Sequence, residues 1–232
     1  LVNQKFFFTM ICSEALLQNR IGVLDLQGGV CEHLDHLERL GITGKRVKES
    51  GDFEDIAGLI LPGGESTCLS RLMRIFGMEE ALLAAFHRGM NIWGTCAGAI
   101  LLATRVLGEK PHLGLIDMAI ERNGFGSQLD SFYREASIPE VSPDAIPLTF
   151  IRAPKIVGVG RDVKVLLQFE DYIAAAENDR VLVTVFHPEL TPCLAFHRYF
   201  ALKCGALTPE SLVDATGHFW NATSWTRLAP HA

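Results

Sequence analysis

Short aliphatic runs alternate with segments of helical periodicity through the first half of the chain. Three runs are continuous enough to be buried strands closed by glycine, at 20–29, 56–64 and 91–94. Apolar residues at 30, 34, 37 and 40 would share one face of a helix that Gly41 ends. Further helices are predicted over 81–89 and 97–108.

The second half of the chain is richer in strand-like segments. They are predicted at 112–122, 163–169, 172–178 and 181–189, with a last amphipathic helix at 192–204. Residues 133–147 are rich in Pro and Ser and are predicted to form a loop. Alternation of buried strands and helices is typical of a parallel sheet covered on both faces. We therefore predict an α/β fold, a three-layer α/β/α sandwich with a mostly parallel central sheet of the flavodoxin-like type.

Composition limits the number of domains and the kinds of partner. A chain of 232 residues that is 48% hydrophobic suits one domain, which we place at 20–204, with a peripheral leader at 1–19 and a peripheral tail at 205–232. The net charge of −6, without clustered Lys and Arg, argues against nucleic acid as a partner. No apolar run is long enough to cross a bilayer, so no membrane partner is expected.

Cysteine spacing gives no sign of a structural metal. None of the six cysteines forms a C-x-x-C pair, so neither a zinc ribbon nor a thioredoxin-type motif is supported. A chain of this length does not need disulfides, and a reducing compartment, the cytoplasm, is the expected location. Most of these cysteines are interpreted as small buried apolar residues.

Three unusual motifs fall where predicted strands end. They are "PGGES" at 62–66, "GTCAG" at 94–98 and "FHPE" at 186–189. In parallel α/β sheets, ligands bind beyond the carboxyl ends of the strands, where the loops meet. The three motifs therefore predict one shared site.

"GTCAG" has the spacing of a nucleophile elbow, with Cys96 at a sharp turn from strand to helix. Residues two positions away must be small at such a turn, and a helix N-terminus favours the ionised thiol. His187 would accept the thiol proton, and Glu189 would orient the imidazole from the same side of an extended segment. The alternatives are a buried cysteine in a glycine turn and a solvated histidine with an exposed glutamate.

The glycine pair of "PGGES" offers main-chain N–H groups to the same site. We expect the amides of Gly64 and Ala97 to form an oxyanion hole, because negative charge develops on the carbonyl oxygen during acyl transfer. The alternative is a plain strand-to-helix turn in which Ser66 is the helix N-cap, a role that Ser66 would fill in either case.

Longer motifs resemble a known family from about residue 20 to residue 203. The triad motifs resemble the class I glutamine amidotransferases. More narrowly, the chain resembles the glutaminase subunits of pyridoxal 5′-phosphate synthase. The resemblance lies in the segments "GVLDLQGGVCEH", "LILPGGEST", "WGTCAGAILLA", "HLGLIDMAIERNGFGSQLDSF", "FIRAP" and "VFHPELT". "PGGEST", "ERNGFGSQ" and "IRAP" together are specific to these subunits. Asp25 departs from the pattern, in which a small residue is usual.

The resemblance implies roles for individual residues. Cys96 would be the nucleophile, with His187 and Glu189 completing the triad. The substrate L-glutamine would contact Gly64, Glu65, Ser66, Arg122, Ile151 and Arg152. A guanidinium fork grips a carboxylate well, but the sequence leaves open which arginine does so. Gln27 would link the oxyanion region to the partner.

The resemblance also implies a reaction and a partner. L-glutamine would be hydrolysed to L-glutamate and ammonia through a thioester, without metal or cofactor. The ammonia would pass to a (β/α)₈-barrel pyridoxal 5′-phosphate synthase subunit in a large hetero-oligomer. The isolated glutaminase would be nearly idle, with the Gly63–Gly64 peptide turned the wrong way until the synthase docks.

Two other kinds of function remain open at this point. One is a glutaminase of another amidotransferase pathway or a γ-glutamyl hydrolase, which would share the triad but not need "ERNGFGSQ" and "IRAP". The other is a non-catalytic regulatory binding subunit of the same fold, against which the intact Cys, His and Glu set argues.

Overall fold

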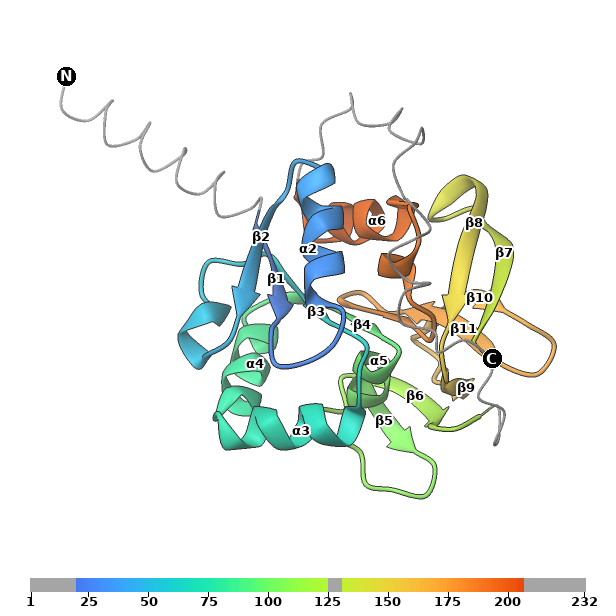
Figure 1. Ribbon diagram of the computed structural model, residues 1–232. Coiled ribbons are helices and arrows are strands. Elements are labelled where there is room, and N and C mark those ends of the chain that lie inside the picture. The colour runs from blue at the N-terminus through green and yellow to red at the C-terminus, as the bar shows by residue number, and fades with distance from the viewer. Residues whose placement is uncertain (1–19, 125–130, 207–232) are drawn as a thin grey trace, which may run out of the picture.

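The computed structural model describes residues 20–124 and 131–206 (Figure 1). The leader predicted at 1–19, almost all of the tail predicted at 205–232, and the "FGSQ" part of the substrate motif lie outside these residues. Within the described part of the chain, no helix is long and apolar enough to span a membrane.

A sheet of mostly parallel strands forms the centre of the fold. Its parallel half runs in the order β2 (Thr43–Val47), β1 (Arg20–Leu24), β3 (Gly58–Leu61), β4 (Asn91–Thr95) and β12 (Val181–Thr184). The strands β3 and β12 are buried along their whole length, as continuous aliphatic runs in a covered parallel sheet must be. The predicted strands at 20–29, 56–64, 91–94 and 181–189 are confirmed.

The sheet continues beyond β12 with mixed pairing. The next strands are β11 (Ile173–Glu177), β9 (Lys155–Val159), β6 (Ile116–Glu121) and β5 (Ala103–Val106), with β10 (Lys164–Gln168) paired to β11. Among these described strands, β5 and β6 pair in parallel and the others are antiparallel. This half curls beneath the parallel half (Figure 1).

Helices cover both faces of the parallel half. The helices α2 (Val30–Arg39) and α6 (Ala195–Lys203) pack side by side on one face (Figure 1). The other face carries α3 (Ser66–Ile75), α4 (Met78–His87) and α5 (Ala97–Leu102). The chain moves from β1 to β2 in one direction and from β3 to β4 in the other, so right-handed crossovers place the helices on opposite faces. The predicted three-layer α/β fold is confirmed.

The loop predicted at 133–147 is wrong. An antiparallel pair occupies this region, β7 (Phe132–Ile138) and β8 (Ser142–Phe150). Each strand has only one neighbour within the described chain, so a proline can turn its missing N–H side away from the ladder. Pro147 lies opposite Glu135, and Pro143 lies where the pairing register shifts, and both an edge strand and a bulge tolerate proline.

The helix predicted over 97–108 is too long. It ends at Leu102, and the chain continues directly as β5. Thr104 and Val106 are β-branched and favour a strand, and β6 provides a parallel partner for them.

The buried face of α2 also differs from the prediction. Leu34 is only partly buried, whereas His33 and His36 are fully buried beside Leu37. The inner face of this helix is therefore partly made of imidazoles.

Two short 3₁₀ turns complete the described chain, η1 (Ser50–Phe53) before β3 and η2 (Pro188–Leu190) after β12. The turn η2 follows the strand end that carries His187.

Candidate active site

Cys96 occupies a strained turn between β4 and α5. Its backbone has φ 45° and ψ −102°, and its main-chain N–H donates to the carbonyl oxygen of Thr184 at 2.8 Å. A Cβ on Gly94 would lie 2.5 Å from the main-chain carbon of Gly98, and one on Gly98 would lie 2.1 Å from the Leu61 carbonyl oxygen. The two flanking glycines are thus required by the close approach of the chain, as the elbow motif predicts.

His187 and Glu189 form a buried pair beside this turn. The Nδ1 of His187 lies 2.8 Å from Oε1 of Glu189, and both side chains are almost fully buried. Glu189 reaches the ring through η2 rather than along the extended segment predicted from the sequence. The N–H of His187 donates to the Thr149 carbonyl oxygen at 2.8 Å, which anchors the loop to β8.

Gly63 joins the two halves of the site. A Cβ on this residue would lie 2.3 Å from Cε1 of His187 and 3.4 Å from Cβ of Cys96. The imidazole and the cysteine therefore meet over the glycine of the "PGGES" loop, where only a residue without a side chain fits.

The charges of His187 and Glu189 stabilise each other. Burial alone would lower the pKa of His187, but the carboxylate of Glu189 and the contact with Cys96 raise it well above the ordinary value. Burial would likewise raise the pKa of Glu189, yet His33 and His187 hold it below the ordinary value. The arrangement favours an imidazolium paired with a carboxylate, with the other ring nitrogen free for proton transfer.

The candidate oxyanion loop packs against the exit turn of β1. A Cβ on Gly64, where φ is 155°, would lie 2.8 Å from Nε2 of Gln27. The Oε1 atom of Gln27 is buried and has no hydrogen-bond partner among the described residues. Ala97, the other predicted donor, is the first residue of α5 directly after the cysteine. Gln27 thus lies against Gly64, while its predicted link to a partner stays a prediction.

Glu65, not Ser66, caps helix α3. The carboxylate of Glu65 accepts hydrogen bonds from the N–H groups of Thr67 at 3.1 Å and Cys68 at 2.7 Å. The prediction that Ser66 is the N-cap is wrong, because the longer acidic side chain of Glu65 reaches back to these amides. Ser66 is the first helical residue, and its buried Oγ has no partner within the described chain.

Arg122 joins Glu65 at this edge of the site. It forms an ion pair with Glu65 and a second one with Glu109 at 3.3 Å. Burial would raise the pKa of Glu65, but the N–H groups of Cys68 and Thr67, together with Arg122, lower it. Two of the predicted substrate contacts, Glu65 and Arg122, are therefore adjacent and paired with each other.

The segment after β8 brings the remaining predicted contacts. The carbonyl oxygen of Ile151 lies 4.0 Å from the sulfur of Cys96, and Arg152 is exposed with φ 44°. Asp25, the departure from the family pattern, forms ion pairs with Arg46 at 2.9 Å and with Lys48 at 3.4 Å.

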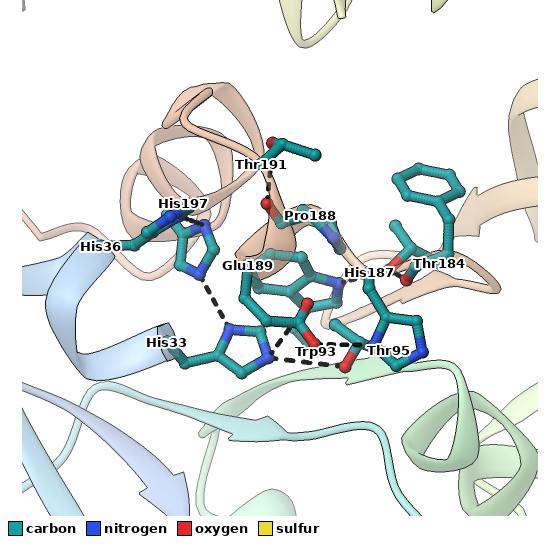
Figure 2. A network of polar contacts seen from close by, with 11 residues as sticks. His33, His36, Trp93, Thr95, Thr184, His187, Pro188, Glu189, Thr191 and His197 are labelled. Carbon is teal, nitrogen blue, oxygen red and sulfur yellow. Dashed lines mark hydrogen bonds and ion pairs between the residues drawn. The ribbon is translucent and has the colours of Figure 1, made fainter. Parts of the chain in front are cut away.

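Sequence reasoning missed three buried histidines behind Glu189. His33, His197 and His36 form a line of rings that leads from this carboxylate into the layer between α2 and α6 (Figure 2). The available signal was the i, i+3 spacing of two histidines on α2, next to Val30 and Leu37, which share its buried face.

Comparison with known proteins places these features in context. Residues 23–206 match the model of the SNO glutamine amidotransferase family. The protein of Syntrophus aciditrophicus (strain SB) named pyridoxal 5′-phosphate synthase subunit PdxT is 71% identical over 223 residues, covering 96% of this chain and all (100%) of that protein. The protein of Ruminiclostridium cellulolyticum with the same name is 47% identical, and the match covers 78% of this chain and 97% of that protein.

Solved structures of glutamine amidotransferases are also similar to this chain. One described as a glutamine amidotransferase is 39% identical, with a TM-score of 0.75, and the match covers 80% of this chain and 98% of that one. A glutamine amidotransferase from Thermotoga maritima, 13% identical with a TM-score of 0.53 over 79% of this chain and 82% of its own, shares the fold.

Proposed function

This chain belongs to the SNO glutamine amidotransferase family, and on that premise we propose that it is the glutaminase subunit of a pyridoxal 5′-phosphate synthase. It hydrolyses L-glutamine to L-glutamate and ammonia. The observation that carries the proposal is the meeting of Cys96 and the His187–Glu189 pair over Gly63, in a chain 71% identical to a named subunit of that synthase.

The first half of the reaction forms a thioester. The sulfur of Cys96 attacks the side-chain amide carbon of glutamine, and the amides of Gly64 and Ala97 stabilise the oxyanion. One such donor contributes on the order of 3 kcal/mol to transition-state stabilisation. His187, charged and held by Glu189, gives its proton to the amide nitrogen as the C–N bond breaks, and ammonia leaves.

The second half releases glutamate. His187, now neutral, takes a proton from a water molecule whose oxygen attacks the thioester carbon. The C–S bond breaks, the sulfur leaves as thiolate beside the recharged imidazole, and glutamate departs. The 2.8 Å contact from Nδ1 to Glu189 supports this alternation, because it fixes the tautomer that turns Nε2 towards the sulfur.

Substrate selection falls to the rim of the site. We assign the substrate contacts to Glu65, Ser66, Arg122, Ile151 and Arg152, supported by the Arg122–Glu65 ion pair and by the Ile151 carbonyl oxygen 4.0 Å from the sulfur of Cys96. In this proposal an arginine binds the α-carboxylate of the substrate, and Glu65 accepts from its ammonium group.

The partner is a (β/α)₈-barrel synthase subunit that receives the ammonia within a hetero-oligomer in the cytoplasm. Gln27 would connect that partner to the oxyanion loop; in support, its amide lies against Gly64 and its buried oxygen has no hydrogen-bond partner among the described residues. Docking that engages this oxygen would reorient the Gly63–Gly64 peptide.

The test is ammonia release from L-glutamine, measured with and without the purified synthase subunit. The wild-type chain is expected to be much faster with the synthase, and Cys96→Ala is expected to be inactive in both conditions. Cys204→Ala is the control, because Cys204 packs against Gly58 at the amino end of β3, away from the site. Equal rates for Cys96→Ala and wild type would remove this cysteine from the mechanism.

A further inference from the structure

A continuous line of buried rings extends from the second oxygen of Glu189. Oε2 of Glu189 lies 3.6 Å from Nε2 of His33. Nδ1 of His33 lies 2.8 Å from Nε2 of His197, and Nδ1 of His197 lies 3.0 Å from Nδ1 of His36. All three residues are fully buried, and Figure 2 shows them in a line that ends at Glu189. The line joins α2, α6 and the loop after β12.

The contacts allow two directions of proton donation along the line, and the charge of Glu189 favours one of them. Each neutral imidazole has one N–H and one acceptor nitrogen. If His36 donates from Nδ1, His197 accepts at Nδ1 and donates from Nε2, and His33 accepts at Nδ1. The remaining N–H of His33 then points from Nε2 towards the carboxylate. The opposite direction would place the lone pair of Nε2 against the negative charge of Glu189.

Burial keeps these rings neutral. It is the largest cause lowering the pKa of His33, of His197, and of His36, which falls to about 3. Glu189 acts in the opposite direction on His33 and His36, and His187 adds to the lowering at His33. Arg39 adds to it at His36 and His197. A neutral ring has one N–H. The direction of donation along the line therefore decides whether Nε2 of His33 presents an N–H or a lone pair to Glu189.

The two oxygens of Glu189 have different surroundings. Oε2 is buried without a hydrogen-bond partner among the described residues, while Oε1 is used by His187. The Nε2 atom of His33, 3.6 Å from Oε2, also lies 3.5 Å from Oγ1 of Thr95. Both distances are longer than those of a good hydrogen bond, and catalytic contacts often shorten only when substrate is bound.

We propose that His33 is a positioning residue of the glutaminase, which orients the carboxylate of Glu189 through its Nε2–H and is itself held in the required tautomer by His197 and His36. The proposal rests on the proposed function in one respect, the role of Glu189 in turnover. The tautomers and the orientation of the carboxylate do not depend on that role.

The first test measures the tautomers directly, without substrate. Long-range ¹H–¹⁵N spectra of the histidine-labelled chain near pH 7 distinguish the two ring nitrogens. We expect neutral rings with the proton on Nε2 in His33 and His197, and on Nδ1 in His36. A proton on Nδ1 of His33, or a doubly protonated His33 ring, would overturn the proposal. This result stands whether or not the chain releases ammonia.

The second test replaces His33 by two amides, each of which matches the position of one ring nitrogen. In His33→Gln the side-chain amide can reach the position of Nε2 and keep a donor towards Glu189. In His33→Asn it reaches only the position of Nδ1, so the contact with His197 is kept and the donor is lost. Synthase-activated turnover of His33→Asn should show kcat reduced about 10- to 100-fold, as for one lost hydrogen bond to a charged group, with KM changed less than about threefold.

The pH profile separates positioning from packing. Without the donor, the carboxyl of Glu189 is easier to protonate, so the acidic limb of kcat/KM should move to higher pH by about one unit in His33→Asn. The His33→Gln limb should stay near that of wild type. Equal kcat and equal acidic limbs in the two variants would overturn the proposal, and an inactive wild type would overturn the proposed function instead. If neither variant folds, as thermal melting would reveal, the tautomer measurement decides.

Discussion

Gly28 and Gly63 touch through their main chains: a Cβ on residue 28 would lie 1.7 Å from the carbonyl oxygen of Gly63. The backbone of Gly28 is also left-handed, with φ 99°. The exit turn of β1 therefore fixes the position of the loop that carries the candidate oxyanion donor, although neither glycine bears a functional group.

Gly28→Ala should displace this loop. The new Cβ cannot stay at 1.7 Å from an oxygen, so the Gly63–Gly64 peptide must leave its present position beside His187 and Cys96. Loss of one oxyanion donor lowers kcat by about 10²- to 10³-fold, and we expect a loss in synthase-activated ammonia release of that order.

Gly89→Ala is the matched control for this variant. Gly89 has φ 113° with nothing within 4 Å of a new Cβ, so it carries the backbone cost of roughly 1–2 kcal/mol without a clash. Its free energy of unfolding should fall by that amount while turnover stays at the wild-type value. A Gly28→Ala variant as active as Gly89→Ala would show that the loop tolerates the displacement.

The Cys96→Gly variant should be more stable than the Cys96→Ala variant. Its φ of 45° is unfavourable for any residue with a Cβ. Both Cys96→Gly and Cys96→Ala lack the sulfur and should release no ammonia. Urea unfolding should find the glycine variant more stable than the alanine variant by about 1 kcal/mol. The reverse order would mean that the turn relaxes without the sulfur and that the strain belongs to the cysteine itself.

Arg122 should contribute to substrate binding rather than to chemistry. It is half-buried at the edge of the site and lies beside two carboxylates, Glu65 and Glu109. A charge-assisted hydrogen bond is worth about 1.5–3 kcal/mol, so Arg122→Ala should raise KM for glutamine by about 10- to 100-fold and change kcat little. Arg105→Ala is the control, since Arg105 is exposed and pairs only weakly with Asp117 at 3.9 Å. An unchanged KM in Arg122→Ala would leave Arg152 as the arginine that binds the substrate.

The sequence predicted those parts of the fold and site that depend on local pattern. Continuous aliphatic strands identified the parallel half of the sheet, and glycines on either side of Cys96 identified a turn in which a side chain would collide with Leu61 or with the helix itself. The spacing of His187 and Glu189 placed two interacting groups within one short loop. Each of these features is encoded by residues that lie close together in the sequence.

Features that depend on distant partners were missed. Pro143 and Pro147 suggested a loop because nothing local shows that β7 will pair with the segment. The histidines of α2 resemble surface residues until α6 brings His197 against them. The choice between Glu65 and Ser66 as N-cap depended on side-chain reach and on Arg122, which is distant in the sequence.

The line of buried histidines should make the stability of the protein depend on pH in a defined direction. In the folded state the pKa values of His33, His36 and His197 lie below the ordinary 6.5, so as pH falls the unfolded chain takes up protons first. Stability is therefore present above pH 6.5 and is lost below it. His187 contributes in the opposite sense, because its raised pKa gives stability that is complete below pH 6.5 and is lost only as pH rises.

His36→Asn should remove part of this acid sensitivity. The amide can donate from the position of Nδ1 to His197 but does not titrate. The pKa of His36 falls to about 3 in the folded chain, so between pH 7 and pH 5 this one ring costs wild type about 2 kcal/mol that the variant does not lose. Urea unfolding of both proteins across this range measures the difference directly, because all other titrating groups are shared. Parallel curves for the two proteins would mean that His36 takes up its proton at the same pH in the folded and the unfolded chain, which its burial beside Arg39 and His197 opposes.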